Sequence, residues 1–491
     1  MSTPQRLPAG PLGLSGQAPL TWVAIGCSLA LVEAFAVQID WQMGVAVAAG
    51  VGLFLALLAR PWLILPLAIT TIFLEHLTFG NLPVTRLLAP PALLLVLAEI
   101  LRGRGRIRVE LPLLCAGAYV VWAIASGMWT SSGAGTRFLL QSLAIALVYL
   151  IAFAALLNTV HQLRVLLYVW SFAAAILGAM SFIAFGGFLE ISHLDLTQAG
   201  RSQGGVGDPD FFAGMQLVTV PLTLVLASDA RNKAVRVLLY AATLCLLASA
   251  FTSLSRGGFI GIVVLGILFL ASKPERLFNS RQEKALALFV VAVGMVGFFS
   301  RPWLRQEVVT RAESIYAPKN KSEESGAGRT NLWKTAAKQA RDHPIGGIGY
   351  GTFPHVSQEL LYQTPGVDTE IIQERAAGHN LVAHNTYLGT AAELGIIGLL
   401  IYLSVIISTA MLLARTARRA VRFGAPFVGR VAHALLLGLA VWSVIAVFLS
   451  AETARMFWII VALSLALPKM VPEPARPSWL ADQPRSNAPT S

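Results

Sequence analysis

A histidine and an asparagine, His384 and Asn385, stand where a long polar segment gives way to an apolar run. Histidine titrates near neutral pH and can take a proton from a hydroxyl group, so this position suits a general base. Asn385 is a favoured N-cap, which predicts that a helix begins there with His384 at its positive end. That field disfavours the imidazolium form and keeps the ring able to accept a proton. A histidine that only caps the helix or bonds a carbonyl is the structural alternative.

Isolated arginines form a second group of residues that could do chemistry. Arginine stays charged and binds phosphate through two parallel donors, which lysine cannot do. Arg201 and Arg256 each lie near a predicted helix start, where the helix N-terminus adds to the attraction for an anion. Snorkelling at helix ends explains any single arginine of this kind. Five of them on one side of the predicted spans indicate an anion site: Arg86, Arg137, Arg201, Arg256 and Arg455.

The composition is that of an integral membrane protein. The chain has 491 residues, of which 56% are hydrophobic and only 13% are charged, and its mean hydropathy is +0.67. Soluble domains are about a quarter charged. The net charge of +12 falls in short clusters between apolar runs. Such clusters act as topology signals, so we do not expect a nucleic-acid partner. The three cysteines lie inside apolar runs, with no spacing that suggests a metal site or disulfides.

The apolar runs predict an all-α fold, a polytopic bundle of about 12–14 transmembrane helices. The runs do not alternate as the strands of a β-barrel would. They cover residues 20–38, 42–59, 61–79, 86–101, 111–128, 138–157, 164–187, 210–228, 235–252, 257–271, 285–300, 385–413, 431–450 and 456–470.

The loops between these runs sort by charge. Four basic loops fall on one side if every run spans once, and the positive-inside rule makes that side the cytoplasm. They are residues 102–108, 231–236, 272–284 and 415–430. The first run has no clear cleavage site, so we expect an uncleaved first helix. The predicted organisation is a cytoplasmic tail (1–19), a helix bundle (20–300), a long external loop (301–383), further helices (384–470) and a cytoplasmic tail (471–491).

The external segments contain recognisable local structure. Asp208 and Pro209 predict a helix start, with Asp208 as the cap and Pro209 in the first turn. Residues 331–343 predict a helix that buries Leu332, Trp333, Ala336, Ala337 and Ala340 on one face and ends at Pro344. The glycines of 346–351 lack the context of a phosphate-binding loop. They favour a turn in which backbone packs closely.

No metal site is predicted in the external segments. Apart from Asp208 and Asp210, they lack a carboxylate pair or a cluster of histidine and carboxylate with ligand spacing. Glu393 lies nine residues after His384, about half a helix turn round at about 100° per residue. It is therefore not expected to assist the base. A buried ion pair with an arginine of a neighbouring helix is its predicted role.

Four segments occur in an order that resembles the O-antigen ligase and polymerase family of bacterial membrane proteins. They are SRGG (255–258), GRTNLW (328–333), HPIGGIGYGTF (343–353) and HNTYLGTAAELGIIG (384–398). The resemblance covers roughly residues 190–410. It implies a helical glycosyltransferase fold of the GT-C kind and a donor glycan linked to undecaprenyl pyrophosphate. It also implies an active site on the periplasmic face of the inner membrane, without a nucleotide sugar, metal or cofactor.

The resemblance also implies roles for individual residues. The external-loop arginines of the family match Arg201 and Arg256, with Arg329 as a third, and these would bind pyrophosphate. The loop histidine matches His384 as the catalytic base. A second pair, His379 and Asn380, leaves open which histidine acts. Further candidate substrate contacts are His379, Asn385, Trp333 and Tyr387, although aromatic residues are also common at membrane interfaces.

Several functions remain open from the sequence. The acceptor could be lipid A–core (a ligase), another lipid-linked chain (a polymerase) or a protein side chain (an O-oligosaccharyltransferase). The length of the external loop favours the ligase, which must accommodate two unlike lipid-borne partners. A lipid-linked glycan flippase would instead require charges in mid-membrane, helix breaks near the bilayer centre and similar halves. A scaffold protein is the third class. Membrane lipids are expected partners in every case.

The predicted topology can be tested by cysteine labelling. With both termini in the cytoplasm, residues 301–383 lie outside, so a cysteine at Ser325 should react with an impermeant reagent in intact spheroplasts. Protection of this cysteine would overturn the assignment of the external side.

Overall fold

The computed structural model describes residues 52–472, except for residues 54, 76–77, 80–81, 106, 190–195 and 199, most of 301–325, and 368–380. By its contacts the chain divides into two units, Met1–Leu63 and Ile64–Ser491. In the first unit, Pro61–Leu63 forms the short 3-10 helix η1. The predicted span 20–38 and most of 42–59 lie outside the described residues.

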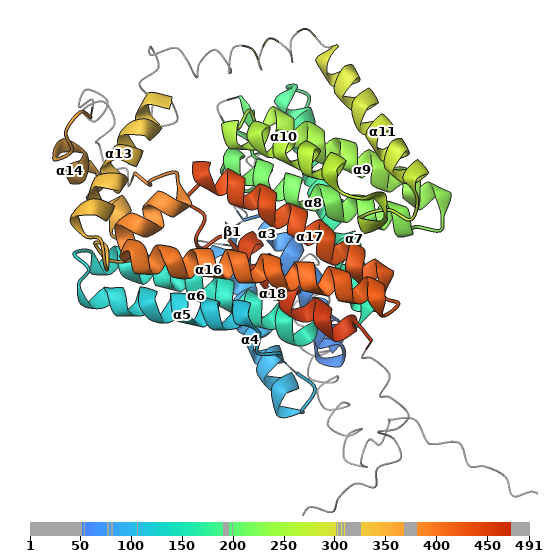
Figure 1. The fold of residues 1–491 in the computed structure, drawn as a ribbon, viewed down its shortest axis with the longest axis horizontal. Helices are drawn as coiled ribbons and strands as arrows, with labels where there is room; N and C mark the ends of the chain where they lie inside the picture. The colour runs from blue at the N-terminus through green and yellow to red at the C-terminus, as the bar shows by residue number, and fades with distance from the viewer. Residues whose placement is uncertain are drawn as a thin grey trace, which may run out of the picture. The chain divides into compact units, whose positions relative to one another are not determined.

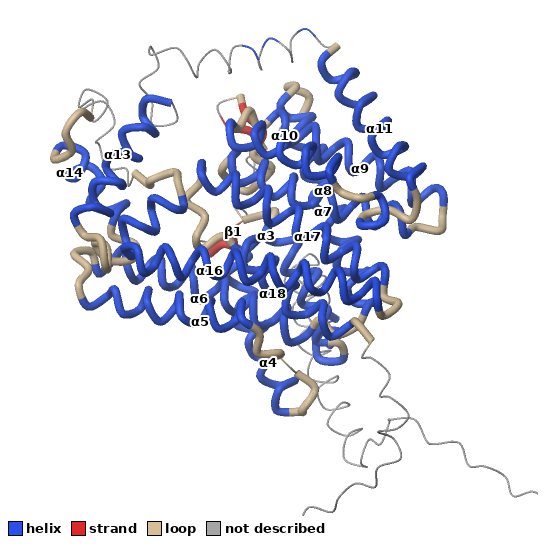
Figure 2. The backbone as a smooth tube through the Cα atoms, viewed as in Figure 1, coloured by secondary structure: helices blue, strands red, loops and turns tan. Residues whose placement is uncertain are grey.

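The second unit confirms the predicted all-α class (Figures 1 and 2). Its α-helices are α3 (Ile64–Ile72), α4 (Val84–Leu101), α5 (Leu111–Ala125), α6 (Gly133–Leu156), α7 (Val160–Phe185), α8 (Pro209–Asp229), α9 (Lys233–Thr252), α10 (Arg256–Ala271), α11 (Arg281–Phe299), α13 (Gly326–Asp342), α14 (Phe353–Tyr362), α16 (Thr386–Arg422), α17 (Pro426–Ile445) and α18 (Arg455–Ala466). Short 3-10 helices are η2 (Ser126–Met128), η3 (Pro274–Arg276), η4 (Ala446–Phe448) and η5 (Leu467–Met470).

Strand structure among the described residues is confined to two antiparallel hairpins of two-residue strands. They pair β1 (Thr78–Phe79) with β2 (Leu82–Pro83), and β3 (Thr197–Gln198) with β4 (Arg201–Ser202). The predicted span 61–79 is wrong in its second half, because helix α3 ends at Ile72 and the chain then enters the first hairpin.

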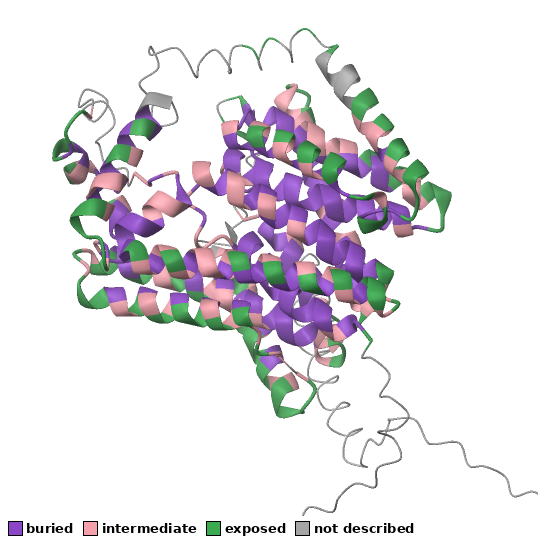
Figure 3. Ribbon diagram, in the orientation of Figure 1, coloured by how far each residue is buried: buried purple, intermediate pink, exposed green. Residues whose placement is uncertain are grey.

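The described residues contain eight helices that are long and apolar enough to cross a membrane. They are α4, α5 with η2, α6, α7, α8, α9, α16, and α17 with η4. Each predicted span from 86–101 onward coincides with a helix. Helix α8 packs against α7, α9, α10 and α17 and is buried along almost its whole length (Figure 3). Large apolar side chains of α4, α5 and α10 point outward, including Leu94, Val121 and Ile267. An exposed apolar surface of this extent suits lipid rather than water.

Helix α16 is broken near its start. Gly395 has φ 66° and ψ −169°, and a Cβ there would lie 2.1 Å from the carbonyl oxygen of Ile345. Only glycine adopts this conformation without strain. The backbone freed by the break is satisfied elsewhere: the Trp122 Nε1 donates to the Leu394 carbonyl (2.9 Å), and the Ile396 N–H donates to Pro344 (2.8 Å). Residues 396–422 still extend about 40 Å, enough to span a bilayer alone.

The other end of α16 corrects a prediction. Residues 415–422 were predicted to belong to a loop, but they form the last two turns of the helix. Alanine and arginine are strong helix formers, so the helix continues past the apolar run. It ends where Gly424 adopts φ 75°, and the Ala425 N–H donates to the Ala420 carbonyl at 2.8 Å.

The long polar segment folds against the start of α16. Helix α13 begins five residues before its predicted start, so Arg329 lies on the helix. Its buried face contains Leu332, Thr335 and Ala336, whereas Trp333, Ala337 and Ala340 are half-buried. The predicted face is therefore rotated, because the cluster that receives α13, with Phe353 and Ala392, lies on the side of Leu332 and Ala336.

The glycine-rich turn after α13 packs backbone against backbone, as predicted. The Ile348 N–H donates to the Ala392 carbonyl and the Gly349 N–H donates to that of Glu393, both at 2.9 Å. A Cβ at Gly347 would lie 2.3 Å from the backbone of Glu393. The turn thus holds the polar segment onto the broken start of α16.

Candidate functional site

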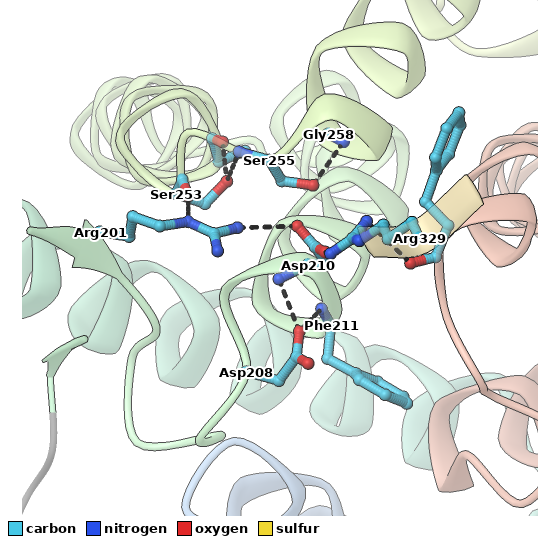
Figure 4. A network of polar contacts seen from close by, with 10 residues as sticks. Arg201, Asp208, Asp210, Phe211, Ser253, Ser255, Gly258 and Arg329 are labelled. Atoms are coloured by element: carbon cyan, nitrogen blue, oxygen red, sulfur yellow. Dashed lines mark hydrogen bonds and ion pairs between the residues drawn. The ribbon is translucent and has the colours of Figure 1, made fainter. Parts of the chain in front are cut away.

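A carboxylate shared by two arginines lies at the start of α8 (Figure 4). Asp210 Oδ1 accepts from Arg201 Nη2 at 2.9 Å, and Asp210 Oδ2 accepts from Arg329 Nη2 at 2.6 Å. All three side chains are buried. The arginines come from β4 and α13, so this one carboxylate joins three separate segments of the chain.

The local sequence around Asp210 explains its position. The Asp208 side chain accepts from the backbone N–H of Asp210 (2.7 Å) and of Phe211 (2.9 Å), and Pro209 is the first helical residue. This is the predicted cap. It places Asp210 in the first turn, on the buried end of α8. The glycines between the β3–β4 hairpin and α8 adopt left-handed backbone, among them Gly204 at φ 57° and Gly207 at φ 85°, which returns the chain from Arg201 to the helix.

The SRGG segment forms the start of α10 beside this pair. Ser255 is the N-cap and accepts from the Gly258 N–H at 2.9 Å, and Arg256 is the first helical residue. The Ser253 carbonyl just before the cap accepts from Arg201 Nε at 3.0 Å. The glycines allow close packing, because a Cβ at Gly258 would lie 2.9 Å from that of Ala213 in α8.

The charges of this region favour an anion. Arg201 and Arg329 bind Asp210, and Asp208 and Arg256 lie at the starts of α8 and α10, which pack together. Three arginines against two carboxylates leave one positive charge in excess. Burial raises the pKa of the Asp208 carboxyl, and the neighbouring Asp210 carboxylate raises it further. The hydrogen bond from the Phe211 N–H lowers this pKa in part. When Asp208 is protonated, the excess becomes two. The N-termini of α8 and α10 add their partial positive charges.

His384 belongs to the same region. The nearby His384 lowers the pKa of the Asp208 carboxyl, and Asp208 is the N-cap of the helix that carries Asp210. The residue is half-buried and adopts left-handed backbone, φ 47°. For a residue other than glycine this is a strained conformation, and such strain concentrates at functional sites. Asn385 is the N-cap of α16, as predicted, and accepts from the N–H groups of Tyr387 and Leu388 at 3.0 Å each.

The connection between α17 and α18 links the start of α16 to Arg329. The Thr386 hydroxyl donates to the Leu449 carbonyl (2.7 Å) and accepts from the Ala451 N–H (3.0 Å). One residue earlier, the Phe448 carbonyl accepts from Arg329 Nη1 at 3.4 Å. The sequence analysis missed this connection. The feature of the sequence that could have revealed this connection is a polar pair, Ser450 and Glu452, between two apolar runs.

A cavity of about 250 Å³ lies beside the start of α16. Its lining includes Ala383, Glu393, His355 and Glu452. Burial raises the pKa of the Glu452 carboxyl, and a hydrogen bond from its own backbone N–H opposes this shift only in part. A carboxyl in this state offers hydrogen-bonding capacity to a ligand.

The predicted ion pair of Glu393 is wrong. Its carboxylate instead accepts from the backbone N–H groups of Gly351 (2.8 Å) and Phe353 (3.0 Å). The turn 343–353 brings two N–H groups to the carboxylate, so backbone rather than arginine satisfies it.

The other three arginines of the predicted anion site interact with separate groups. Arg455 forms an ion pair with Glu75, the Arg86 guanidinium lies over the Phe138 ring, and Arg137 bonds a carbonyl of its own helix. Three arginines therefore remain as candidates for the predicted anion site: Arg201, Arg256 and Arg329.

The aromatic candidates have packing roles. The Trp333 ring lies 6.1 Å from that of Phe448, and the Tyr387 hydroxyl donates to the Ser443 carbonyl at 2.6 Å, between α16 and α17. His379 lies outside the described residues. Among the residues that the structure describes, no group of three His, Cys, Asp or Glu side chains could hold a metal ion.

Comparison with known families bears on the same region. The family model described as O-antigen ligase matches residues 241–403, and the predicted resemblance is confirmed across that segment. The matched residues include Arg256, Arg329 and His384, whereas Arg201 and Asp210 precede them. The family indicates glycan transfer of the O-antigen ligase or polymerase type in a membrane. No curated protein matches the chain.

The shared carboxylate should be a main support of this end of the bundle. Asp210→Asn leaves two buried guanidinium groups without their counter-charge, and breaking a buried ion pair typically costs about 3–5 kcal/mol. We expect a clear drop in the unfolding temperature of the purified protein in detergent. Asp342→Asn removes an exposed carboxylate that pairs with Lys338, and should leave this temperature unchanged. Equal unfolding temperatures for the two variants would contradict a supporting role for Asp210.

Proposed function

We propose that this protein is a membrane glycosyltransferase that moves a glycan from undecaprenyl pyrophosphate to an acceptor hydroxyl, most specifically an O-antigen ligase with lipid A–core as acceptor. The observation that carries the proposal is a set of contacts at the start of α16. Thr386, two residues after His384, bonds the Leu449 carbonyl, and the adjacent Phe448 carbonyl accepts from Arg329, which shares Asp210 with Arg201. An anion site and a base are the two groups that this reaction requires.

The arginines suit the donor. When the bond between the anomeric carbon and the pyrophosphate oxygen breaks, negative charge grows on the phosphate, and fixed guanidinium groups stabilise it. Asp210 holds Arg201 and Arg329 in place before the donor arrives, which reduces the reorganisation needed during the reaction. The positive excess matches a pyrophosphate diester of charge about −2 when Asp208 is protonated.

His384 suits the acceptor. In the proposed step the imidazole takes the proton of the acceptor hydroxyl, and the oxygen bonds to the anomeric carbon as the pyrophosphate leaves with the bonding electrons. This single displacement inverts the anomeric centre and needs no metal or cofactor.

We assign the acceptor sugar to the cavity beside the start of α16. Glu452 and His355 offer polar groups to sugar hydroxyls, next to Ala383, which directly precedes the base. Polymerase and O-oligosaccharyltransferase activities would use the same chemistry with other acceptors and remain alternatives.

A lipid-linked glycan flippase is less well supported than a glycosyltransferase. It requires charged groups in mid-membrane, whereas the charged groups of the proposed site lie at helix starts, with Asp210 in the first turn of α8 and Arg256 as the first residue of α10. The proposed location is the bacterial inner membrane, with this site on the periplasmic side. The domain organisation predicted from the basic loops is retained as part of the proposal.

The phosphate-binding role can be tested at Arg256. Arg256→Lys keeps the charge but loses the two-pronged geometry, which should slow transfer by roughly 10- to 150-fold for the loss of one charge-assisted contact. The measurement is the transfer rate of purified protein with a lipid-linked donor. Arg137→Lys, at an exposed arginine outside the cluster, serves as the matched control and should keep its activity. Full activity in folded Arg256→Lys would argue against a pyrophosphate site.

The base can be tested by comparing two histidines. His384→Ala should retain donor binding and slow transfer by about 10²–10⁴-fold, the usual contribution of a positioned base. His379→Ala should cost much less. Transfer rate and donor binding are measured for both variants. Normal turnover in His384→Ala together with an inactive His379→Ala would assign the base to His379.

A further inference from the structure

Four arginines lie together on the last turns of α16, at the opposite end from His384. Their spacing of i, i+3, i+4 and i+7 places them on one helical face. They are Arg415, Arg418, Arg419 and Arg422. This face lines a hollow of about 570 Å³. Such a cluster at a helix end serves as a topology signal, but a topology signal does not require a hollow.

The four guanidinium groups lack acidic partners within the part of the chain that the structure describes. No ion pair includes any of them, and Arg419 instead lies over the Phe423 ring at 5.9 Å. Glu110 is the single acidic residue among the described residues that line the hollow. The negative end of the α16 dipole compensates only part of this charge. Mutual repulsion remains, so a bound anion would stabilise this end.

The other wall of the hollow is apolar. It is formed by Leu412, Phe423, Pro468 and Val471. A soluble anion gains nothing from such a wall, whereas an amphiphile places its phosphate on the arginines and its hydrocarbon against the apolar side chains. Leu412 belongs to the apolar part of α16 and Arg422 lies about 15 Å further along the helix, so the hollow extends from hydrocarbon depth into the headgroup layer.

We propose that this hollow binds the headgroup of an anionic phospholipid of the membrane leaflet at the C-terminal end of α16. Basic pockets between transmembrane helices are suited to such headgroups. The site is separate from the proposed transfer site, because Arg422 lies at the far end of α16, about 40 Å of helix beyond the break at Gly395. By the charge of the loops, the leaflet is the cytoplasmic one.

Lipid binding to the full-length protein in detergent tests this proposal. The probes are phosphatidylglycerol, phosphatidylcholine and inorganic pyrophosphate, and the readout is retention of each by native mass spectrometry. Phosphatidylglycerol should be retained in preference to phosphatidylcholine. The variant with all four arginines changed to Gln should retain it roughly 10- to 1,000-fold more weakly. If that variant does not fold, the pair Arg418→Gln and Arg422→Gln replaces it, with a smaller loss expected.

A matched variant removes the same charge elsewhere on the predicted cytoplasmic side. It changes to Gln the exposed residues Arg104, Arg231, Lys233 and Arg281, and it should retain phosphatidylglycerol as the unchanged protein does. An equal loss in both variants would show general charge attraction and overturn the site. Equal retention of both lipids would overturn it as well. Displacement of the lipid by pyrophosphate would identify a soluble-anion site instead. Because binding is measured without glycan transfer, these outcomes are independent of the proposed function.

Discussion

The Asp210 carboxylate is the contact on which the rest of the polar end depends. It holds two buried guanidinium groups, from segments 128 residues apart in the sequence, that would otherwise repel one another (Figure 4). Buried charges are tolerated only when they are paired and hydrogen-bonded. The same contact therefore explains why Arg201 and Arg329 can lie inside the protein and why they are held in fixed positions. A preorganised cation pair of this kind suits the stabilisation of charge that develops in a reaction.

A second constraint is the close approach of the 343–353 turn to the start of α16. Hydrogen bonds to backbone groups on both sides of Gly395 compensate for the break in the helix. The Glu393 carboxylate takes two further N–H groups from the turn. Because these groups are buried, leaving one unpaired would be costly. The turn, the break at Gly395 and the Glu393 carboxylate thus hold one another in place. Together they position the start of α16, which follows His384.

The two ends of α16 have different chemistry on one continuous element. Its start carries Asn385 as a cap beside His384, where the helix dipole is positive and the neighbouring arginines are paired with carboxylates. Its far end carries arginines without such partners among the described residues. The first arrangement suits reversible binding of an anionic donor. The second suits a lasting contact with the charged surface of a membrane.

The sequence alone determined the features that depend on neighbouring residues. The helical spans follow from runs of apolar residues, and Asp208 and Asn385 act as caps because each bonds to N–H groups two and three residues ahead. Residue types also marked Arg201 and His384, and the family resemblance marked Arg329, without showing which side chains they contact. Only the tertiary structure decided that Asp210 bridges two arginines, that backbone satisfies Glu393, and that Thr386 ties α16 to the connection after α17. These partners lie 40 or more residues apart in most cases, and a side chain's type does not specify which distant group will satisfy it once both are buried.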